Sequence, residues 1–521
     1  MSRRILPVLL FLSLLQATAQ VAPHVFFRVT LGSSFPRPAS GRLLVFFKQG
    51  SGDSEVNTEE FAPEATWVFA REVHDLAPGD SVEVDGTDDV FPSSLALLPA
   101  GNYEAQAVLD LDRSYNYRGR NVGDWISSVV ALPGWSPLSG PEPTLTLNHH
   151  PVETPQHSAA MKAAFAEAKP GVAESKYLYS KALTGFWGTP TLLQAWVILP
   201  PGYADHPGEH YPTVYWTHGF GGDMGSSLGT GLQIRKRMDT GTMPPMIWVM
   251  LDESCPQGTH EFADSVNDGP WGTALTTEFI PYLEQIYRMD AKPTGRLLNG
   301  HSSGGWATLQ LQINYPQVFG GTWSTSPDPS DFHDFTGIDL YAPNANAYHS
   351  ADGKPYPIMR DKGKVIATFE QFSRLEAVLG PYGGQVSSFD WVFSPRATGG
   401  GPVPMFDRQT GAVDPTVVKY WHEHFDLANI VETTWAQRGP MLKGRIHLFV
   451  GTADTFYLDG AAHLFEARLR KLGADPEFRY FTNKTHFDLY ASGDDRGALF
   501  DRIGAEMYGV ARPNGDWKPK K

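Results

Sequence analysis

The pentapeptide Gly300-His301-Ser302-Ser303-Gly304 is the most informative part of this sequence. It follows a short apolar run, Arg296 to Asn299, and opens a helix-like stretch from Gly305 to Tyr315. A serine between glycines, on a sharp turn from a strand into a helix, is the layout of a nucleophile elbow. Because a serine hydroxyl is a weak nucleophile at neutral pH, the turn must hold it beside a base and opposite amide donors. The pattern also occurs by chance, so the rest of the site must be found independently.

Strands and helices alternate on both sides of this pentapeptide. Short, almost wholly apolar runs are predicted strands, and amphipathic stretches such as Gly272 to Tyr287 are predicted helices. Together they indicate an α/β fold, with a mostly parallel sheet, helices on both of its faces, and ligands at the carboxyl ends of its strands. The predicted strands are Leu192 to Leu199, Tyr211 to Thr217, Met246 to Leu251, Leu297 to Asn299, Thr322 to Thr325, Ile446 to Val450 and Phe478 to Phe481.

The first part of the chain has a different pattern. Strand-like runs separated by Gly, Pro, Ser and Asp turns fill residues 20–135, and Tyr103 to Ala107 alternates as a half-buried strand does. We expect a small all-β sandwich there, followed by a linker over 136–170. The α/β domain is expected over 171–512, with 326–443 as a lid-like insertion over the sheet edge.

The first nineteen residues have the pattern of a cleaved signal peptide. Arg3 and Arg4 precede the apolar run Ile5 to Leu15, and a stretch of small residues ends at Ala19. We therefore expect residues 1–19 to direct export to a periplasm or to the outside of the cell. No later apolar run reaches the roughly eighteen residues of a membrane span.

Composition narrows the range of partners. The formal net charge is −15, so nucleic acid and anionic membranes are not expected to bind. Cys255 is the only cysteine, which rules out an internal disulfide, and we expect it to be buried. The pairs His149-His150 and His422/His424 lack a third ligand or a shared helix face, so no metal and no cofactor are expected. The oligomeric state has no signature in the sequence.

An acid and a base follow the elbow in the chain order that an elbow serine requires. Asp454 lies just after the predicted strand Ile446 to Val450, and His486 follows the next strand. His486 would take the proton of Ser302, and Asp454 would fix the tautomer of His486. Asp459 is a rival acid that lies farther from the end of the strand.

A glycine-rich loop, His218-Gly219-Phe220-Gly221-Gly222, follows the predicted strand Tyr211 to Thr217. Its glycines let backbone amides approach an oxyanion, and we expect the amides of Phe220 and Ser303 to be the two donors. The imidazole of His218 is expected to be structural. Candidate residues of the substrate pocket are Glu253, Cys255, Trp271 and Asp328.

The sequence resembles the Putative esterase family of α/β-hydrolases, which includes esterase D, the enterochelin esterases, feruloyl and acetylxylan esterases and the mycolyltransferases. The resemblance covers about residues 175–510, although Lys484 to Phe487 lacks the glycines often found before the family's histidine. It implies hydrolysis of a small-molecule or saccharide-linked ester through a serine acyl-enzyme. The motifs that carry it are Leu199-Pro200-Pro201-Gly202-Tyr203, His218 to Gly222, Gly269-Pro270-Trp271-Gly272, the elbow, and Ser326-Pro327-Asp328-Pro329.

Three hypotheses follow. The first is an exported serine esterase that acts through Ser302. The second keeps the fold but transfers the acyl group to a sugar or cleaves peptides; a propeller-like repeat, frequent in such peptidases, is absent from the sequence. The third is a catalytically silent binding protein, which the presence of both Ser302 and His486 disfavours.

Overall fold

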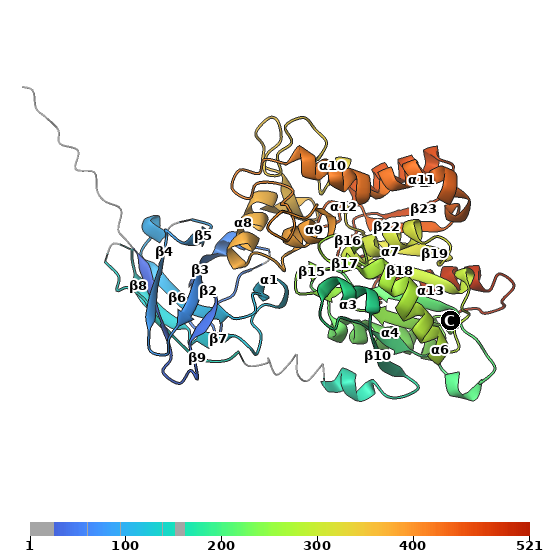
Figure 1. The fold of residues 1–521 in the computed structure, drawn as a ribbon, viewed down its shortest axis with the longest axis horizontal. Helices are drawn as coiled ribbons and strands as arrows, with labels where there is room; N and C mark the ends of the chain where they lie inside the picture. Colours follow the sequence, from blue (N-terminus) through green and yellow to red (C-terminus); the bar gives the residue numbers. More distant parts are fainter. Residues whose placement is uncertain (1–24, 60, 94, 138, 152–161, 521) are drawn as a thin grey trace, which may run out of the picture.

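The computed structural model describes residues 25–59, 61–93, 95–137, 139–151 and 162–520. The expected signal peptide, residues 1–19, lies outside the described residues. Figure 1 shows a β-rich N-terminal part, in blue, beside a larger part in which helices surround a second sheet. Among the described helices, none is both long and apolar enough to cross a membrane.

The larger part is built on an eight-stranded sheet in the order β10-β11-β13-β12-β18-β19-β22-β23. The two pairings that involve β11 are antiparallel, and the strands from β13 to β23 are all parallel. The mostly parallel sheet expected from the sequence is therefore confirmed. The strands are β10 (Ala173–Tyr179), β11 (Leu192–Ile198), β12 (Thr213–Thr217), β13 (Ile247–Leu251), β18 (Arg296–His301), β19 (Gly321–Thr325), β22 (Ile446–Gly451) and β23 (Glu477–Phe481).

Helices cover both faces of this sheet. On one face, α4 (Met224–Thr240) and α13 (Ala498–Ala511) pack on Val214 and Trp216 of β12. On the other face, α6 (Ile280–Ile286) and α7 (Ser303–Asn314) pack on Tyr215 of the same strand. All residues of β12, β13 and β19 are buried, which explains why none of these strands carries a charged side chain.

The predicted helix Gly272 to Tyr287 is not regular. It consists of α5 (Trp271–Ala274), a π-helical stretch (Leu275–Phe279) and α6. Leu275, Phe279 and Leu283 are buried as predicted, but Ile286, the last residue of α6, is 45% exposed. The extra residue in the π-helical turn rotates the end of the apolar stripe toward solvent.

The segment between β19 and β22 forms a helical layer beside the sheet. Its core side chains, including Phe332, Phe393 and Trp421, form one cluster with Trp306 of α7 and Phe465 of α12 (Leu458–Lys471). The elements of this segment are β20 (Pro357–Asp361), β21 (Lys364–Thr368), α8 (Phe369–Leu379), α9 (Gln385–Phe393), α10 (Pro415–His424) and α11 (Leu427–Leu442).

The N-terminal part is one curled sheet in the order β4-β1-β9-β7-β6-β2-β3-β5, with β8 beside β6. Arg71 of β3 donates a hydrogen bond of 2.7 Å to the carbonyl oxygen of Glu83 in β4, so the two ends of this order approach each other. The strands are β1 (Phe26–Leu31), β2 (Ala39–Gln49), β3 (Thr66–Leu76), β4 (Ser81–Asp85), β5 (Asp89–Phe91), β6 (Gly101–Asp110), β7 (Trp125–Ser127), β8 (Val130–Trp135) and β9 (Thr144–His149).

One expectation for this part is not confirmed, and another needs correction. The strands are joined in one continuous hydrogen-bonded sheet that curls around its core, so the two separate sheets of a sandwich are not confirmed. The stretch 136–170, expected to be linker, supplies β9, which pairs with β1 and β7. The pairing with β1 is parallel and joins segments that are far apart in the sequence, so no local sequence pattern predicts it.

Strand β6 was expected to be half-buried, yet both of its faces are covered. Tyr103 and Ala105 point into the core that the curled sheet encloses. On the opposite face Gln106 is 1% exposed and donates to the carbonyl oxygen of Ser127 at 2.9 Å. Val56, Ser127 and Arg120 of the N-terminal part cover Gln106, and Val108 on the same face packs against Leu375 in the segment that follows β19.

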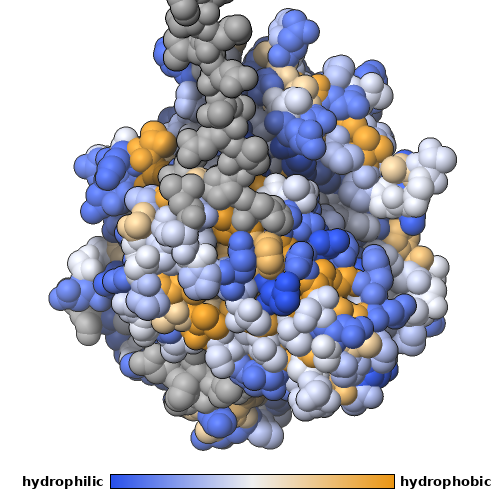
Figure 2. Space-filling view, turned by 90° about the vertical axis from the view of Figure 1, so that its left-hand side faces the viewer, coloured by the Kyte–Doolittle hydropathy of each residue, from blue (hydrophilic) through white to orange (hydrophobic). Residues whose placement is uncertain are grey.

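Helix α8 is the main partner of that outer face. Leu375 and Leu379 of α8 belong to one buried cluster with Leu44 and Phe46 of β2. Figure 1 shows α8 lying beside the N-terminal sheet. Figure 2 looks onto the end of the molecule that the N-terminal part forms, which carries mostly hydrophilic or neutral residues with small apolar patches between them. Apolar burial therefore joins the two parts through β2, β3 and β5.

Arg42 of β2 locks this contact. It is 5% exposed, its Nε donates to the carbonyl oxygen of Val378 at 3.0 Å, and it forms ion pairs with Glu72 and Asp89. A cation at the end of α8 satisfies carbonyl groups that have no partner within the helix.

We expect Arg42→Ala to lower the free energy of unfolding by about 2–3 kcal/mol, because it leaves the buried carbonyl oxygen of Val378 without its charged donor. Urea unfolding measures this change. Arg28→Ala is the matched control: Arg28 also lies on the N-terminal sheet, but its pair with Glu83 is half-exposed, and we expect a loss below about 1 kcal/mol. Equal losses in the two variants would contradict the role of Arg42.

Candidate active site

The site lies where β12 and β18 end side by side. Helix α4 follows β12 on one face of the sheet, and α7 follows β18 on the other. Chain segments that leave adjacent parallel strands toward opposite faces open a crevice at the carboxyl edge of the sheet. The glycine loop 218–222 and the pentapeptide 300–304 meet there.

Ser302 occupies a strained position between β18 and α7. Its backbone has φ 60° and ψ −126°, and its amide donates to the carbonyl oxygen of Thr325 at 3.1 Å. A non-glycine residue in such a conformation costs about 1–3 kcal/mol, which only a tightly packed surrounding can impose. This is the elbow expected from the sequence pattern.

Glycines allow this turn to pack against loop 218–222, the expected oxyanion loop. A Cβ on Gly304 would lie 2.2 Å from the carbonyl oxygen of His218. A Cβ on Gly219 would lie 2.8 Å from the Cβ of Ser302. The glycines at these positions therefore serve close approach of two backbones, in addition to the turn itself.

His486 and Asp454 lie together in the loops after β23 and β22. The Nδ1 of His486 is 3.0 Å from the Oδ2 of Asp454, and the two residues are 4% and 0% exposed. Burial alone would raise the pKa of Asp454, but the charge and hydrogen bond of His486 outweigh burial and hold that pKa below its ordinary value. His486 and Ser302 line the same cavity.

The rival acid Asp459 has a different partner. Its Oδ1 accepts a 2.7 Å hydrogen bond from Nη2 of Arg360, which comes from β20. The Nε of the same arginine donates to the carbonyl oxygen of Asp454 at 2.7 Å. Asp459 thus helps to anchor the loop, while the side chain of Asp454 meets the histidine.

The residues expected to supply the oxyanion donors, Phe220 and Ser303, lie at the same edge of the sheet as the serine. Ser303 is the first residue of α7, where backbone amides have no partner within the helix. Its hydroxyl donates to the Oδ2 of Asp328 at 2.7 Å, which fixes the side chain away from the serine. Phe220 lines the cavity, and its ring meets the ring of Tyr117 edge-on at 5.4 Å.

Tyr117 comes from α1 (Tyr115–Arg118) of the N-terminal part and was not found from the sequence. Its hydroxyl donates to the carbonyl oxygen of Gly222, the last residue of the oxyanion loop. Asn116 beside it lines the cavity and donates to the carbonyl oxygens of Glu376 and Gly380 at 3.0 Å. The N-terminal part therefore contacts the oxyanion loop and α8 together, although about 100 residues separate Tyr117 from Gly222.

His218 forms a buried pair with Asp252, which agrees with its expected structural role. Its Nε2 lies 3.0 Å from the Oδ1 of Asp252, and its Nδ1 lies 2.8 Å from the carbonyl oxygen of Gly219. Burial would lower the pKa of His218, but the hydrogen bond to Asp252 raises it overall. Burial would raise the pKa of Asp252, but His218 lowers it to about 2. This ion pair holds the oxyanion loop against the neighbouring strand.

A cavity of about 630 Å³ opens at this edge, and most of its wall is apolar. The segment after β19 supplies much of that wall, and the N-terminal part supplies Thr58, Glu59 and Asn116. No lysine or arginine occurs among the described residues that line it. Apolar lining residues from the segment after β19 include Phe335, Ile358, Phe369, Phe372, Leu375 and Phe389.

The four candidate pocket residues are placed differently. Asp328 lines the cavity, and burial raises the pKa of its carboxyl to about 6. Glu253, Cys255 and Trp271 are buried but are not among the residues that line the cavity. These three residues follow β13 in the chain, but the segment after β13 is buried in the core. A position after the end of a strand therefore did not predict access to the cavity.

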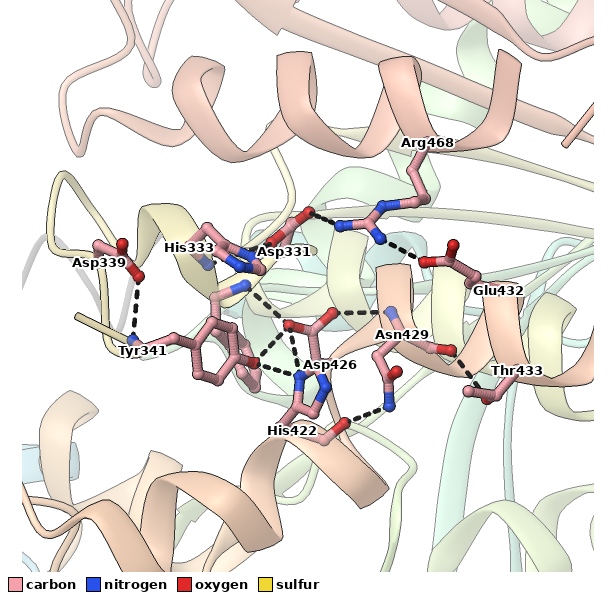
Figure 3. Close-up of polar contacts among 11 residues, drawn as sticks. Asp331, His333, Asp339, Tyr341, His422, Asp426, Asn429, Glu432, Thr433 and Arg468 are labelled. Atoms are coloured by element: carbon pink, nitrogen blue, oxygen red, sulfur yellow. Dashed lines mark hydrogen bonds and ion pairs between the residues drawn. The ribbon is translucent and has the colours of Figure 1, made fainter. Parts of the chain in front are cut away.

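A possible metal cluster lies in the segment after β19, between Asp331, His333 and Asp426 (Figure 3). Asp426 begins α11, where its Oδ1 accepts from the amide of Asn429 at 3.0 Å, and its Oδ2 accepts from the hydroxyl of Tyr341 at 2.5 Å. His333 and Arg468 contact the two oxygens of Asp331. Because protein groups already contact all four carboxylate oxygens, we assign these residues a structural role.

The strand order, the strained serine and the glycine loop together define a protein with an α/β-hydrolase-like fold. A family model described as Putative esterase matches residues 190–498, which is more than half of the sequence, and the chain therefore belongs to this family.

Individual relatives match smaller parts of the chain or differ widely in sequence. Esterase MT1326 and Esterase Rv1288, from two strains of Mycobacterium tuberculosis, are each 32% identical over 145 residues, 27% of this chain and 30% of theirs. A ferulic acid esterase structure covers 65% of this chain and 98% of its own, with 14% identity and a TM-score of 0.40. An S-formylglutathione hydrolase from Agrobacterium tumefaciens covers 66% of this chain and 95% of its own, with 14% identity and a TM-score of 0.36. The chain thus spans less than a third of the curated relatives.

The His218–Asp252 pair predicts a stability difference that depends on pH. The ordinary pKa of Asp252 is 3.8 and its folded pKa is about 2, so its contribution is present above about pH 4 and is lost as the pH falls toward 2. The pKa of His218 is raised above 6.5, so its contribution is present below 6.5 and is lost as the pH rises through the folded value.

We therefore expect Asp252→Asn to lower the free energy of unfolding by about 2–4 kcal/mol near pH 5–6, with a smaller difference on both sides of that window. Urea unfolding over a pH series measures the difference. Asp239→Asn serves as the control, since Asp239 is 48% exposed in its pair with Arg235, and it should cost below about 0.5 kcal/mol at every pH. A cost for Asp252→Asn that stays constant from pH 3 to pH 9 would rule out the charged pair.

Proposed function

We propose that this protein hydrolyses a carboxylic ester through an acyl-enzyme on Ser302. The observation that carries the proposal is the 3.0 Å contact between His486 and Asp454, both buried, at a cavity that also exposes Ser302 on its strained turn. A buried carboxylate next to one ring nitrogen leaves the other nitrogen of the histidine free to act as a base.

The proposed reaction follows from these positions. His486 takes the hydroxyl proton of Ser302 as the oxygen attacks the ester carbonyl, and it returns that proton to the leaving alcohol. Asp454 stabilises the imidazolium that forms in between. The amides of Phe220 and Ser303 would stabilise the oxyanion, and removal of one such donor costs roughly 10²- to 10³-fold in rate in related chemistry. Water then attacks the acyl-enzyme with His486 as the base, and the acid leaves as the proton returns to the oxygen of Ser302.

The cavity supports a neutral ester with a bulky apolar group as substrate. Aromatic and aliphatic side chains cover most of its wall, which favours burial of an apolar group. Its acidic lining residues are Glu59, Asp328 and Glu376, and the described lining residues include no lysine or arginine that could pair with a substrate carboxylate. The cavity therefore favours a neutral substrate over an anionic one.

The rest of the chain has supporting roles in this proposal. Residues 326–443 act as a lid-like cover, supported by the apolar wall that they supply to the cavity. The N-terminal part completes the cavity, supported by the contacts of Asn116 and Tyr117. Export is proposed on the leader sequence 1–19 alone.

Replacement of the serine tests the reaction. We expect Ser302→Ala to lower kcat on a neutral p-nitrophenyl ester by roughly 10⁴- to 10⁶-fold, because the nucleophile is lost while the fold is kept. A fluorophosphonate probe should label the wild-type protein and Ser303→Ala, which retains its amide, but not Ser302→Ala. Labelling that persists in Ser302→Ala would refute the assignment, and a wild type that neither turns over the ester nor takes the label would favour a binding protein.

A second pair of variants decides between the two acids. Asp454→Asn should lower kcat by about 10³- to 10⁴-fold, because the histidine loses the carboxylate that sets its tautomer. Asp459→Asn keeps the contact between His486 and Asp454 and removes only the ion pair of Asp459 with Arg360. It should therefore lower kcat less than about tenfold. Steady-state kinetics with the same ester compares the two; the reverse order would assign the role to Asp459.

A further inference from the structure

The turn that follows β6 in the N-terminal part gathers three carboxylates. Asp110, Asp112 and Asp124 each place an oxygen within 4.8 Å of the others. Asp110 and Asp124 are each 1% exposed, whereas Asp112 is exposed. The residues alternate in the stretch Asp110-Leu111-Asp112-Arg113-Ser114, so three oxygen-bearing side chains come from every second position.

No described lysine or arginine pairs directly with this cluster, although the charges of Arg118 and Arg120 act on Asp112 and Asp124 from a distance. Among the described residues, none of the three aspartates forms an ion pair. The neighbouring arginines have other partners: Arg113 pairs with Glu72, and Arg120 pairs with Glu55. Two buried carboxylates next to a third, without a cation, are electrostatically unfavourable. This distinguishes the turn from the Asp331 cluster of Figure 3, where Arg468 supplies a positive charge.

One oxygen of the cluster also lacks a hydrogen-bond partner. The Oδ2 of Asp124 accepts from the amide of Asn121 at 2.8 Å, but its Oδ1 is fully buried and accepts no hydrogen bond of good geometry. Buried polar atoms of this kind call for a ligand, water or ion.

We propose that the turn 110–124 binds one Ca²⁺ ion through the carboxylates of Asp110, Asp112 and Asp124. All three candidate ligands are carboxylate oxygens, and they come from the end of β6 and from the turn that follows it. Calcium takes six to eight oxygens in flexible geometry, whereas zinc prefers nitrogen and sulfur ligands and magnesium demands a near-octahedral site. Calcium therefore fits this donor set best.

A bound ion at this turn would affect the wall of the cavity. The same turn contains α1, whose Asn116 and Tyr117 contact α8 and the oxyanion loop. The amide of Tyr115 donates to Asp110 at 3.0 Å, so the aspartate is joined directly to the start of α1. Bound calcium would fix this turn and with it the wall that the N-terminal part gives to the cavity.

Calcium titration of the chelator-treated full-length protein tests the proposal without any substrate, so its result does not depend on the proposed esterase activity. We expect calorimetry to show one Ca²⁺ per chain with a Kd between about 1 µM and 1 mM, and weaker binding of Mg²⁺. Calcium should also raise Tm and slow amide hydrogen exchange within residues 110–124. No binding up to 10 mM Ca²⁺, or tighter binding of Mg²⁺ than of Ca²⁺, would overturn it.

Variants locate the ion. Asp124→Asn should weaken Ca²⁺ binding at least tenfold. Asp112→Asn repeats the test at an exposed position, where folding is not at risk. Asp331→Asn is the matched control, because it removes a buried carboxylate from the other acidic cluster, and its Kd should stay within twofold of wild type. Binding that is unchanged in both Asp124→Asn and Asp112→Asn, or lost in Asp331→Asn, would place the ion elsewhere.

Discussion

The close approach of two backbone turns governs this structure. The elbow at Ser302 and the loop after β12 pack so tightly that a Cβ on Gly304 would lie 2.2 Å from the carbonyl oxygen of His218. This contact holds the serine at φ 60° and places the oxyanion loop beside it. It is possible only because β12 and β18 are adjacent and parallel, so their carboxyl ends meet at one edge. The order of strands in the sheet thus determines which loops meet at this edge.

Around this edge, three parts of the chain contribute different things. The sheet supplies the serine, histidine and aspartate on loops of fixed position. The segment after β19 supplies the apolar wall of the cavity, and Arg360 from that segment anchors the loop that carries Asp454. The N-terminal sheet reaches the oxyanion loop through Tyr117. A sheet domain that could have been a separate module is instead a wall of the cavity, because β2 buries its outer face against α8.

The sequence predicted the parts of the sheet whose signals are local. β12 and β13 are short, largely apolar strands buried on both faces, and these runs stand out in the sequence. By contrast, the sequence analysis missed β10. This edge strand has no continuous apolar run, because all of its residues after Ala173 are partly buried or exposed. The strand β9 was read as linker because only its pairing with β1, far away in sequence, makes it part of a sheet.

The sequence by itself determined the α/β class, the elbow around Ser302 and the chain order of Asp454 and His486, because each depends on residue type and on spacing along the chain. Tertiary structure alone decided that the side chain of Asp454, and not that of Asp459, meets the histidine. It also decided that Asp328 lines the cavity while Glu253, Cys255 and Trp271 do not, and that Tyr117 contacts Gly222. The physical reason is that both features depend on how the layers of the fold pack. Packing sets the direction of a side chain at the end of a strand and brings together segments about 100 residues apart, and neither effect produces a periodic pattern in the sequence.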